Sequence, residues 1–138
     1  MLPTYAIGID VGATTTKIGL ISAVSGAPST LLDHQSIPSQ LGGTDPAHFL
    51  AAVGRVIEDY LAAHPVAGIG VSLCSLINAE HSGALLSVNA PALNNLDIKR
   101  TLTERYGCPV LVGNDVAAHA LGEYHFGAGQ GVQRLLCL

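Results

Sequence analysis

A short segment near the start of the chain gathers side chains suited to binding a phosphate. Apolar residues flank a polar turn whose candidate ligands are Asp10, Gly12, Ala13, Thr14, Thr15 and Lys17. A tight turn aims backbone N–H groups at phosphate oxygens, hydroxyl and ammonium groups add donors, and Asp10 can hold Mg²⁺ through water. Gly12 lets the phosphate approach the backbone because it has no side chain. The segment indicates a site for a magnesium-bound polyphosphate; the alternative is an ordinary hairpin with a threonine-rich turn.

A second candidate is the pair Asn114 and Asp115, which lies where a predicted strand runs into a helix. In open α/β sheets, ligands bind beyond the carboxyl ends of the parallel strands. A carboxylate at that position can accept the proton of a substrate hydroxyl, which is the general-base role in phosphoryl transfer. The alternative is that Asp115 is only the N-cap of the helix, since aspartate is favoured there and is stabilised by the helix dipole.

The elements that position these residues follow from hydrophobic patterning. After the opening hairpin, strands are expected at 29–37, 66–73, 109–114 and 132–138, and residues 84–88 are a candidate for a short returning strand outside the main order. Helices are expected from Asp45 as N-cap with Pro46 at the first helical position, from about 97 to 106 before Gly107, and from 116 to about 126 after the Asp115 cap. The order β-β-β-α-β-α-β-α-β predicts an α/β fold with a mixed sheet, in which three antiparallel strands precede helix-linked parallel ones.

Composition limits the classes of function. A chain of 138 residues with a net charge of −4 and six dispersed Lys and Arg residues is expected to be one domain that binds no nucleic acid. No apolar stretch is long enough for a membrane span, and no signal peptide is expected. Three cysteines without CxxC spacing favour a reducing, cytoplasmic setting with inert core thiols. The histidines show no metal-ligand spacing with the cysteines: His34, His48, His64, His81, His119 and His125.

Several weaker candidates are assigned structural roles. Ser72 and Ser75 have no partnered histidine and are interpreted as loop polar residues. Glu123 and Tyr124 are expected to pack or cap at the end of the last helix. The Gly127–Gly131 segment follows a helix instead of a strand, so it does not indicate a dinucleotide loop.

Four segments together resemble the N-terminal lobe of the ROK family of bacterial sugar kinases and related repressors. They are 8–14 with Lys17, 87–91, 113–118 and 122–131. The resemblance covers essentially the whole chain and implies an actin-like ATPase lobe of the ribonuclease H-like, hexokinase type, with a mixed five-stranded sheet and helices on both faces. This sequence departs from the family pattern at three places. Ala13 stands where a second glycine is usual, Cys74-Ser75 replaces a common Pro-Gly, and Asn78 replaces a frequent aspartate.

The resemblance also implies an activity and its residues. Asp10, Gly12, Thr14 and Lys17 fall in the first phosphate loop of an ATP- and Mg²⁺-dependent hexose or amino-hexose kinase. Asn89, Asn114 and Asp115 fall where family members contact the sugar, with Asp115 as the catalytic base. The complete protein is expected to be a glucokinase-like cytoplasmic homodimer.

A second lobe is expected to carry the other phosphate loop, the adenosine pocket and any zinc site. Residues 1–138 alone are therefore expected to be nearly inactive. The alternative functions are a non-catalytic sugar sensor or regulator without its DNA-binding segment, and another actin-like ATPase. A first strand that begins a few residues after Met1 favours the kinase over the repressor.

Overall fold

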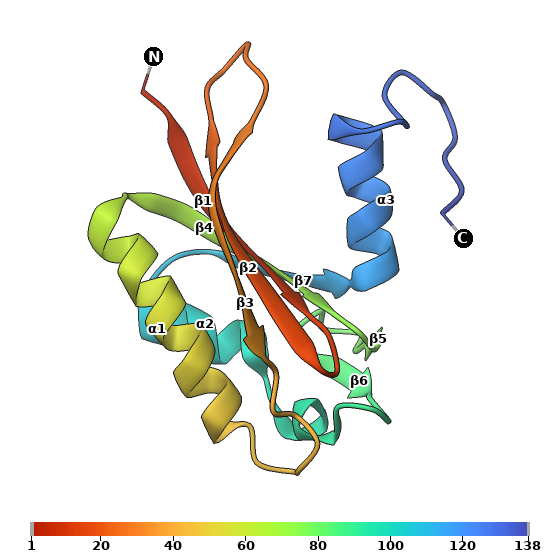
Figure 1. Ribbon diagram of the computed structural model, residues 1–138. Helices are drawn as coiled ribbons and strands as arrows, with labels where there is room; N and C mark the ends of the chain where they lie inside the picture. Colours follow the sequence, from red (N-terminus) through yellow and green to blue (C-terminus); the bar gives the residue numbers. More distant parts are fainter. Residues whose placement is uncertain (1, 138) are drawn as a thin grey trace.

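The computed structural model describes residues 2–137 and shows one mixed sheet with helices on both of its faces (Figure 1). In chain order the elements are β1 Thr4–Val11, β2 Thr15–Ala23, β3 Thr30–Pro38, α1 Ala47–Ala63, β4 Val66–Leu73, β5 Leu76–Ile77, β6 Ala84–Leu86, the 3₁₀ helix η1 Pro91–Asn95, α2 Ile98–Tyr106, β7 Val110–Asn114 and α3 Asp115–Phe126. This confirms the α/β class expected from the sequence.

The main sheet has the strand order β3-β2-β1-β4-β7, and β5 and β6 form a separate two-stranded ladder. β1 pairs antiparallel with β2, and β2 with β3, whereas β4 lies parallel to β1 and β7 lies parallel to β4. The register places Lys17 on one side of Asp10 and Ser72 on the other. In turn, Gly113 lies beside Ser72. The carboxyl ends of the three parallel strands therefore meet at one edge, as predicted.

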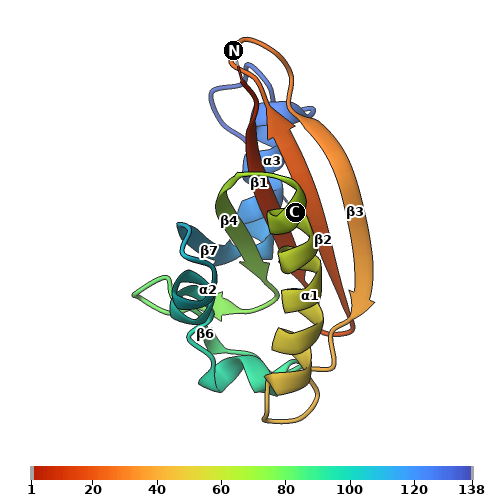
Figure 2. The same ribbon diagram turned by 90° about the vertical axis from the view of Figure 1, so that its left-hand side faces the viewer.

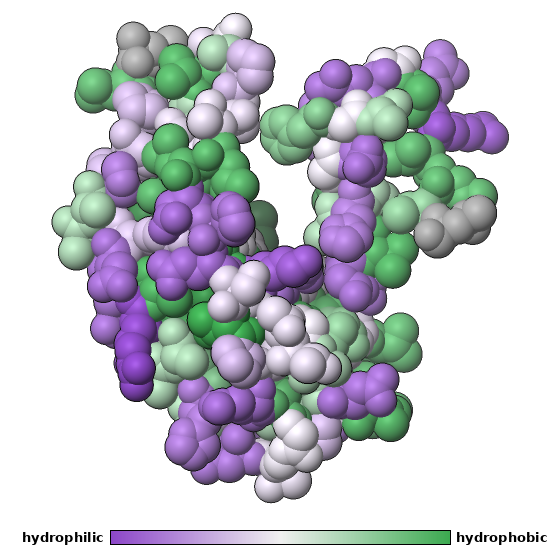
Figure 3. Space-filling view, viewed as in Figure 1, coloured by the Kyte–Doolittle hydropathy of each residue, from purple (hydrophilic) through white to green (hydrophobic). Residues whose placement is uncertain are grey.

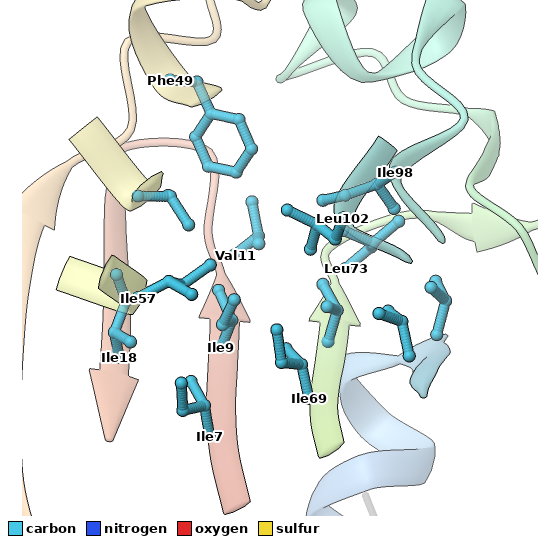
Figure 4. Close-up of a cluster of buried hydrophobic side chains, with 14 of the residues drawn as sticks. Ile7, Ile9, Val11, Ile18, Phe49, Ile57, Ile69, Leu73, Ile98 and Leu102 are labelled. Carbon is cyan, nitrogen blue, oxygen red and sulfur yellow. The ribbon is translucent and has the colours of Figure 1, made fainter. Parts of the chain in front are cut away.

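The hydrophobic core lies between the sheet and the helices α1 and α2. Alternate residues of β1 point into it, and α1 contributes Phe49, Val53 and Ile57, all at most 1% exposed. Ile98 and Leu102 of α2 complete the cluster (Figure 4). Seen from the side, α1 lies in front of the strands and α3 behind them (Figure 2). Since successive strand residues alternate in direction, Asp10 projects away from this core, on the side of α3.

Most helix boundaries agree with the sequence, and the N-caps of two helices differ. Asp97 caps α2 by accepting a hydrogen bond from the Arg100 N–H, and Gly107 ends that helix with φ of 67°, as expected. The N-cap of α1 is Pro46 instead of Asp45, although the Asp45 carboxylate still accepts a hydrogen bond from the Ala47 N–H at 2.9 Å. The N-cap of α3 is Asn114 instead of Asp115, because the Asn114 amide oxygen reaches the first free N–H groups.

The prediction of a strand at 132–138 was wrong for residues 132–137, the part that the structure describes. Residues 132–137 are irregular, and Leu138 lies outside the described residues. The turn after α3 directs the chain back beside that helix (Figure 1). The segment therefore does not reach the edge of β7, and a strand without a pairing edge has no ladder to join. None of the helices within residues 2–137 has the length and apolarity needed to cross a bilayer.

Tyr60 links α1 to β3 and gives the fold a predicted sensitivity to alkaline pH. Its hydroxyl donates to Asp33 Oδ2 at 3.0 Å, and burial, with the bond and charge of Asp33, raises the pKa of Tyr60 to about 12. The unfolded chain releases this proton near pH 10, so this contribution to stability is complete below pH 10 and is lost between pH 10 and 12. We expect a decrease of about 2 to 3 kcal/mol in that window. Urea unfolding of wild type and Tyr60→Phe from pH 9 to 12 tests this; equal pH slopes would contradict it.

Candidate functional site

The turn between β1 and β2 is closed by one backbone hydrogen bond, from the Gly12 N–H to the Thr15 carbonyl at 3.0 Å. A Cβ on Gly12 would lie 2.6 Å from that same carbonyl oxygen, so the turn itself requires glycine. Ala13 has no positive φ and packs against the hydrophobic core. Alanine in place of the usual second glycine therefore fits this turn without backbone strain.

The tip of this turn presents unsatisfied hydrogen-bond donors. Within residues 2–137, the backbone N–H groups of Ala13 and Thr14 donate to no protein acceptor. Thr14, Thr15 and Lys17 are exposed around them. Adjacent N–H groups without acceptors, with hydroxyl and ammonium donors beside them, have the chemistry required to bind an anion. The predicted phosphate-loop residues are thus brought together as an accessible group.

Ser39, which the sequence analysis did not identify, supports the turn from beneath. Its hydroxyl donates to the Gly12 carbonyl at 2.7 Å and lies 2.7 Å from Thr16 Oγ1, while its N–H donates to the Thr14 carbonyl at 2.9 Å. Ser39 and Thr16 are both fully buried. A serine that follows a proline in a polar loop gives no sequence signal of this role, because its partners are 23 and 27 residues away.

Ser39→Ala is expected to lower the free energy of unfolding by about 1 to 3 kcal/mol, because it leaves Thr16 Oγ1 and the Gly12 carbonyl without their buried partner. Chemical denaturation measures this loss. The control is Ser36→Ala, at an exposed position on the adjoining strand. Equal stabilities of the two variants would show that the Ser39 network contributes nothing to the fold.

Asp10 is half-buried at the end of β1, and its carboxylate is held from β4. The Ser72 hydroxyl donates to Asp10 Oδ1 at 2.7 Å. Ser72 is buried within β4, so its interpretation as a loop residue was wrong. No three His, Cys, Asp or Glu side chains within residues 2–137 form a group that could hold a metal ion. A single carboxylate suits Mg²⁺ that keeps its waters and is carried by phosphates, and does not suit an all-protein cage.

Asn114 and Asp115 stand at the junction of β7 and α3. The Asn114 side chain accepts from the N–H groups of Val116 and Ala117, and its amide donates to the Ser75 carbonyl at 2.9 Å. One amide hydrogen remains for a ligand. Asp115 Oδ1 accepts from the Val116 N–H at 2.9 Å. The carboxylate, half-buried in the first turn of α3, keeps its second oxygen free of hydrogen bonds within residues 2–137.

Cys74 lies between the two candidate carboxylates and was predicted to be a core thiol. It is only half-buried. Burial raises the pKa of the Cys74 thiol, and the negative charges of Asp115 and Asp10 raise it further. The thiol is therefore protonated at neutral pH and is a poor nucleophile. The register of β1, β4 and β7, in which Val11 pairs with Leu73 and Leu73 with Asn114, places Asp10 and Asp115 at the same edge of the sheet.

Asn89 is an exposed residue of the loop between β6 and η1. This loop is held by Asn94, whose side chain accepts from the Ser87 N–H at 2.6 Å and donates to the Ser87 carbonyl at 3.0 Å. No hydrogen bond of the described chain joins Asn89 to Asn114 or Asp115. The connection is indirect, from Asn114 through Ser75 and the β5–β6 ladder to this loop.

A hollow of about 850 Å³ separates α3 from the sheet, and we call it the α3 hollow. Figure 3 shows it as a deep notch beside the α3 arm. Its sheet wall includes Gly8, Asp10, Gly70, Ser72 and Gly113, and its helix wall includes Ala118, Leu121, Gly122, His125 and Phe126. Within the described chain, α3 has no buried side chain. Asp10 and Lys17 are thus among the polar residues of a mostly apolar lining.

At the end of α3, Glu123 is confirmed as a capping residue. Its carbonyl accepts from the Gly127 and Gly129 N–H groups, and its carboxylate accepts from the Ala128 N–H. Tyr124, by contrast, is 43% exposed and stacks edge-on against His125. The Gly127–Gly131 segment is therefore the C-terminal turn of a helix.

The lobe has the actin-like ATPase fold, with its phosphate-type turn and helix-capping pair at one edge of a mixed sheet. The sequence matches the family described as "ROK family" over residues 6–138, and the chain belongs to that family. It is 27% identical over 132 residues to a glucokinase of Streptomyces coelicolor, covering 96% of this chain and 39% of that protein. The chain thus spans about two fifths of the length of this curated relative.

Two solved structures show both branches of the family. A ROK family glucokinase of Streptomyces griseus, in complex with glucose and AMPPNP, superimposes with a TM-score of 0.77 at 26% identity, over 92% of this chain and 38% of that one. A ROK family transcriptional regulator, a homolog of the Escherichia coli MLC protein, superimposes with a TM-score of 0.76 at 27% identity. The match covers 95% of this chain and 33% of the regulator chain. Kinases and regulators therefore share this lobe.

Proposed function

We propose that this chain is the N-terminal lobe of an ATP-dependent hexose or amino-hexose kinase. The observation that supports this most directly is the Gly12 turn: within residues 2–137 the Ala13 and Thr14 N–H groups have no acceptor, and the turn follows β1, the strand that carries Asp10 near its end. The strand register, in which Val11 pairs with Leu73 and Leu73 with Asn114, supports a candidate base, Asp115, at the same sheet edge as Asp10. Since the chain spans about two fifths of its curated kinase relative, the activity is proposed for the complete protein.

In this proposal, Asp115 is the general base. A sugar hydroxyl is a poor nucleophile, and a carboxylate that accepts its proton during attack on the γ-phosphate makes the reaction feasible. The Asp115 Oδ1 bond to the Val116 N–H fixes the carboxylate, while Oδ2 is available to the hydroxyl. Asn114 contributes its remaining amide hydrogen to the sugar, and the exposed Asn89 is a further sugar ligand.

The phosphate end consists of Asp10, Gly12, Ala13, Thr14, Thr15 and Lys17. The turn's N–H groups and the threonine hydroxyls donate to phosphate oxygens, and Lys17 adds positive charge. Asp10 would hold a nucleotide-bound Mg²⁺ through the ion's water shell, as a single carboxylate does when the phosphates carry the metal. When bound, Mg²⁺ neutralises charge on the transferred phosphate. Closure by a second lobe would exclude water, so that the sugar accepts the phosphate.

Titration and turnover with the complete protein test this function. Calorimetric titration with Mg-ATP, glucose and N-acetylmannosamine reports binding, and a coupled assay that detects ADP reports phosphorylation. Binding of both nucleotide and sugar with sugar-dependent release of ADP supports the kinase. Sugar binding without nucleotide binding would contradict the kinase function and favour a second candidate, a sugar-sensing regulator.

That second candidate is a sugar-sensing regulator, which is favoured by one specific observation. The structural match to a ROK transcriptional regulator is as good as the match to a kinase, with TM-scores of 0.76 and 0.77. Such a protein would use the Asn89, Asn114 and Asp115 region to bind sugar without phosphoryl transfer. The intact turn at Gly12 and the exposed donors at its tip favour the kinase.

A further inference from the structure

Ser72 is the hydrogen-bond partner that the described chain provides for the Asp10 carboxylate. Its Oγ donates to Asp10 Oδ1 at 2.7 Å, and the two residues are register partners on the parallel strands β1 and β4. Lys17, the register partner on the other side, forms no ion pair with Asp10 within residues 2–137. One neutral hydroxyl thus holds the carboxylate, and Asp10 Oδ2 accepts no hydrogen bond from the described chain.

The surroundings of Ser72 leave this hydroxyl at the wall of a ligand-accessible space. Ser72 is 8% exposed and lines the α3 hollow together with Asp10. Its neighbours on the same sheet face are Gly70, two residues earlier, and Gly113, across the β4–β7 pair. A Cβ added to either glycine would meet nothing within 4 Å. Ser72 is therefore the side chain of β4 that reaches Asp10, with a glycine on either side of it on this face.

We propose that Ser72 is a positioning residue that fixes the Asp10 carboxylate for the water shell of a magnesium nucleotide; this inference rests on the proposed kinase function. A carboxylate at a strand end can rotate about two side-chain bonds, and a hydrogen bond to its charged oxygen selects one arrangement. With Oδ1 held by Ser72, Oδ2 is presented to the ligand. Removal of such a supporting partner typically lowers metal affinity or activity 10- to 100-fold.

A purely structural role predicts a different pattern. If Ser72 only satisfied its own hydroxyl within the sheet, its removal would destabilise the fold equally whether or not Asp10 carried a charge. If Ser72 acts through Asp10, its removal has little further effect once Asp10 is neutralised, because residues in one hydrogen-bonded pair are not additive. A double-mutant cycle therefore separates the two roles.

The experiment uses the complete protein with Ser72→Ala, Ser72→Thr, Asp10→Asn and the double variant S72A/D10N. Calorimetry measures the affinity for a magnesium complex of a non-hydrolysable ATP analogue, and separately for glucose. For Ser72→Ala we expect a 10- to 100-fold loss of nucleotide affinity with unchanged sugar affinity and unfolding temperature. Ser72→Thr keeps the hydroxyl, and the open space at Gly113 leaves room for the added methyl. This variant is expected to retain most of the nucleotide affinity.

The matched control is Thr103→Ala, which removes a hydroxyl donor from the exposed surface of α2. It is expected to bind nucleotide as wild type does. If Ser72→Ala bound the nucleotide as tightly as wild type, the inference would be overturned and the kinase proposal would stand. The same holds if Ser72→Ala lowered nucleotide affinity equally in the wild-type protein and in the Asp10→Asn variant. Parallel losses of sugar affinity and unfolding temperature would also overturn it. A wild-type protein that bound no magnesium nucleotide would overturn both proposals.

Discussion

Replacing Asp115 by asparagine is expected to lower kcat of the complete protein about 10²- to 10⁴-fold, the range typical for loss of a general base. The amide has nearly the same size as the carboxylate but cannot accept the proton of the sugar hydroxyl. Because the N-cap of α3 is Asn114, the start of the helix is preserved in this variant. The sugar affinity should therefore fall far less than turnover. Steady-state kinetics and sugar titration measure the two effects separately.

Asp97→Asn is the matched control, since Asp97 also lies at a helix start, on α2. Asparagine caps as well as aspartate does, so this variant should keep both its stability and its turnover. Near-normal kcat in Asp115→Asn would remove the base assignment. Equal decreases in both variants would point instead to a general effect on stability.

The second large effect is expected for Gly12→Ala. The added methyl would lie 2.6 Å from the Thr15 carbonyl oxygen, so the turn must open. Opening would break the Gly12 to Thr15 hydrogen bond and displace the N–H groups of Ala13 and Thr14. Misplacement by about 1 Å can cost on the order of 100-fold in rate, and we expect kcat/KM for Mg-ATP to fall by that amount. The strain is also expected to cost about 1 to 3 kcal/mol of stability.

Gly43→Ala is the control for this variant, because a Cβ there would meet nothing within 4 Å and the residue has no positive φ. Stability is measured by chemical denaturation, and kcat/KM is measured with Mg-ATP as the varied substrate. A Gly12→Ala protein with wild-type kcat/KM would show that the turn does not bind the phosphates.

The regular elements could be predicted because each has a local signal. The spacing of Phe49, Val53 and Ile57 predicts a helix, and Gly107 ends α2 because it adopts φ of 67°. Hydrophobic patterning does not encode whether a terminal segment finds a pairing edge. For that reason the apolar residues 132–137 were predicted as a strand, although the turn after α3 directs them elsewhere.

The polar loop residues of the site could be predicted from the sequence, but the buried residues that hydrogen-bond to them could not. Asp10 and Asp115 stand out because each interrupts or follows an apolar run. Ser39 and Ser72 act across 27 and 62 residues of sequence, so only the folded sheet brings them to Gly12 and Asp10. One signal was available for Ser72: it follows Gly68 and Gly70 at alternating positions, on the face of β4 that carries no apolar side chain.

The three hydrogen bonds of Asn114 have a mechanical consequence. The Asn114 side chain is hydrogen-bonded both to the first N–H groups of α3 and to the Ser75 carbonyl, which precedes β5. If α3 tilted, the Cys74-Ser75 loop would therefore move together with Asp115 as one rigid unit. Asp115, the proposed proton acceptor, would keep its position relative to that loop while both moved relative to the Gly12 turn.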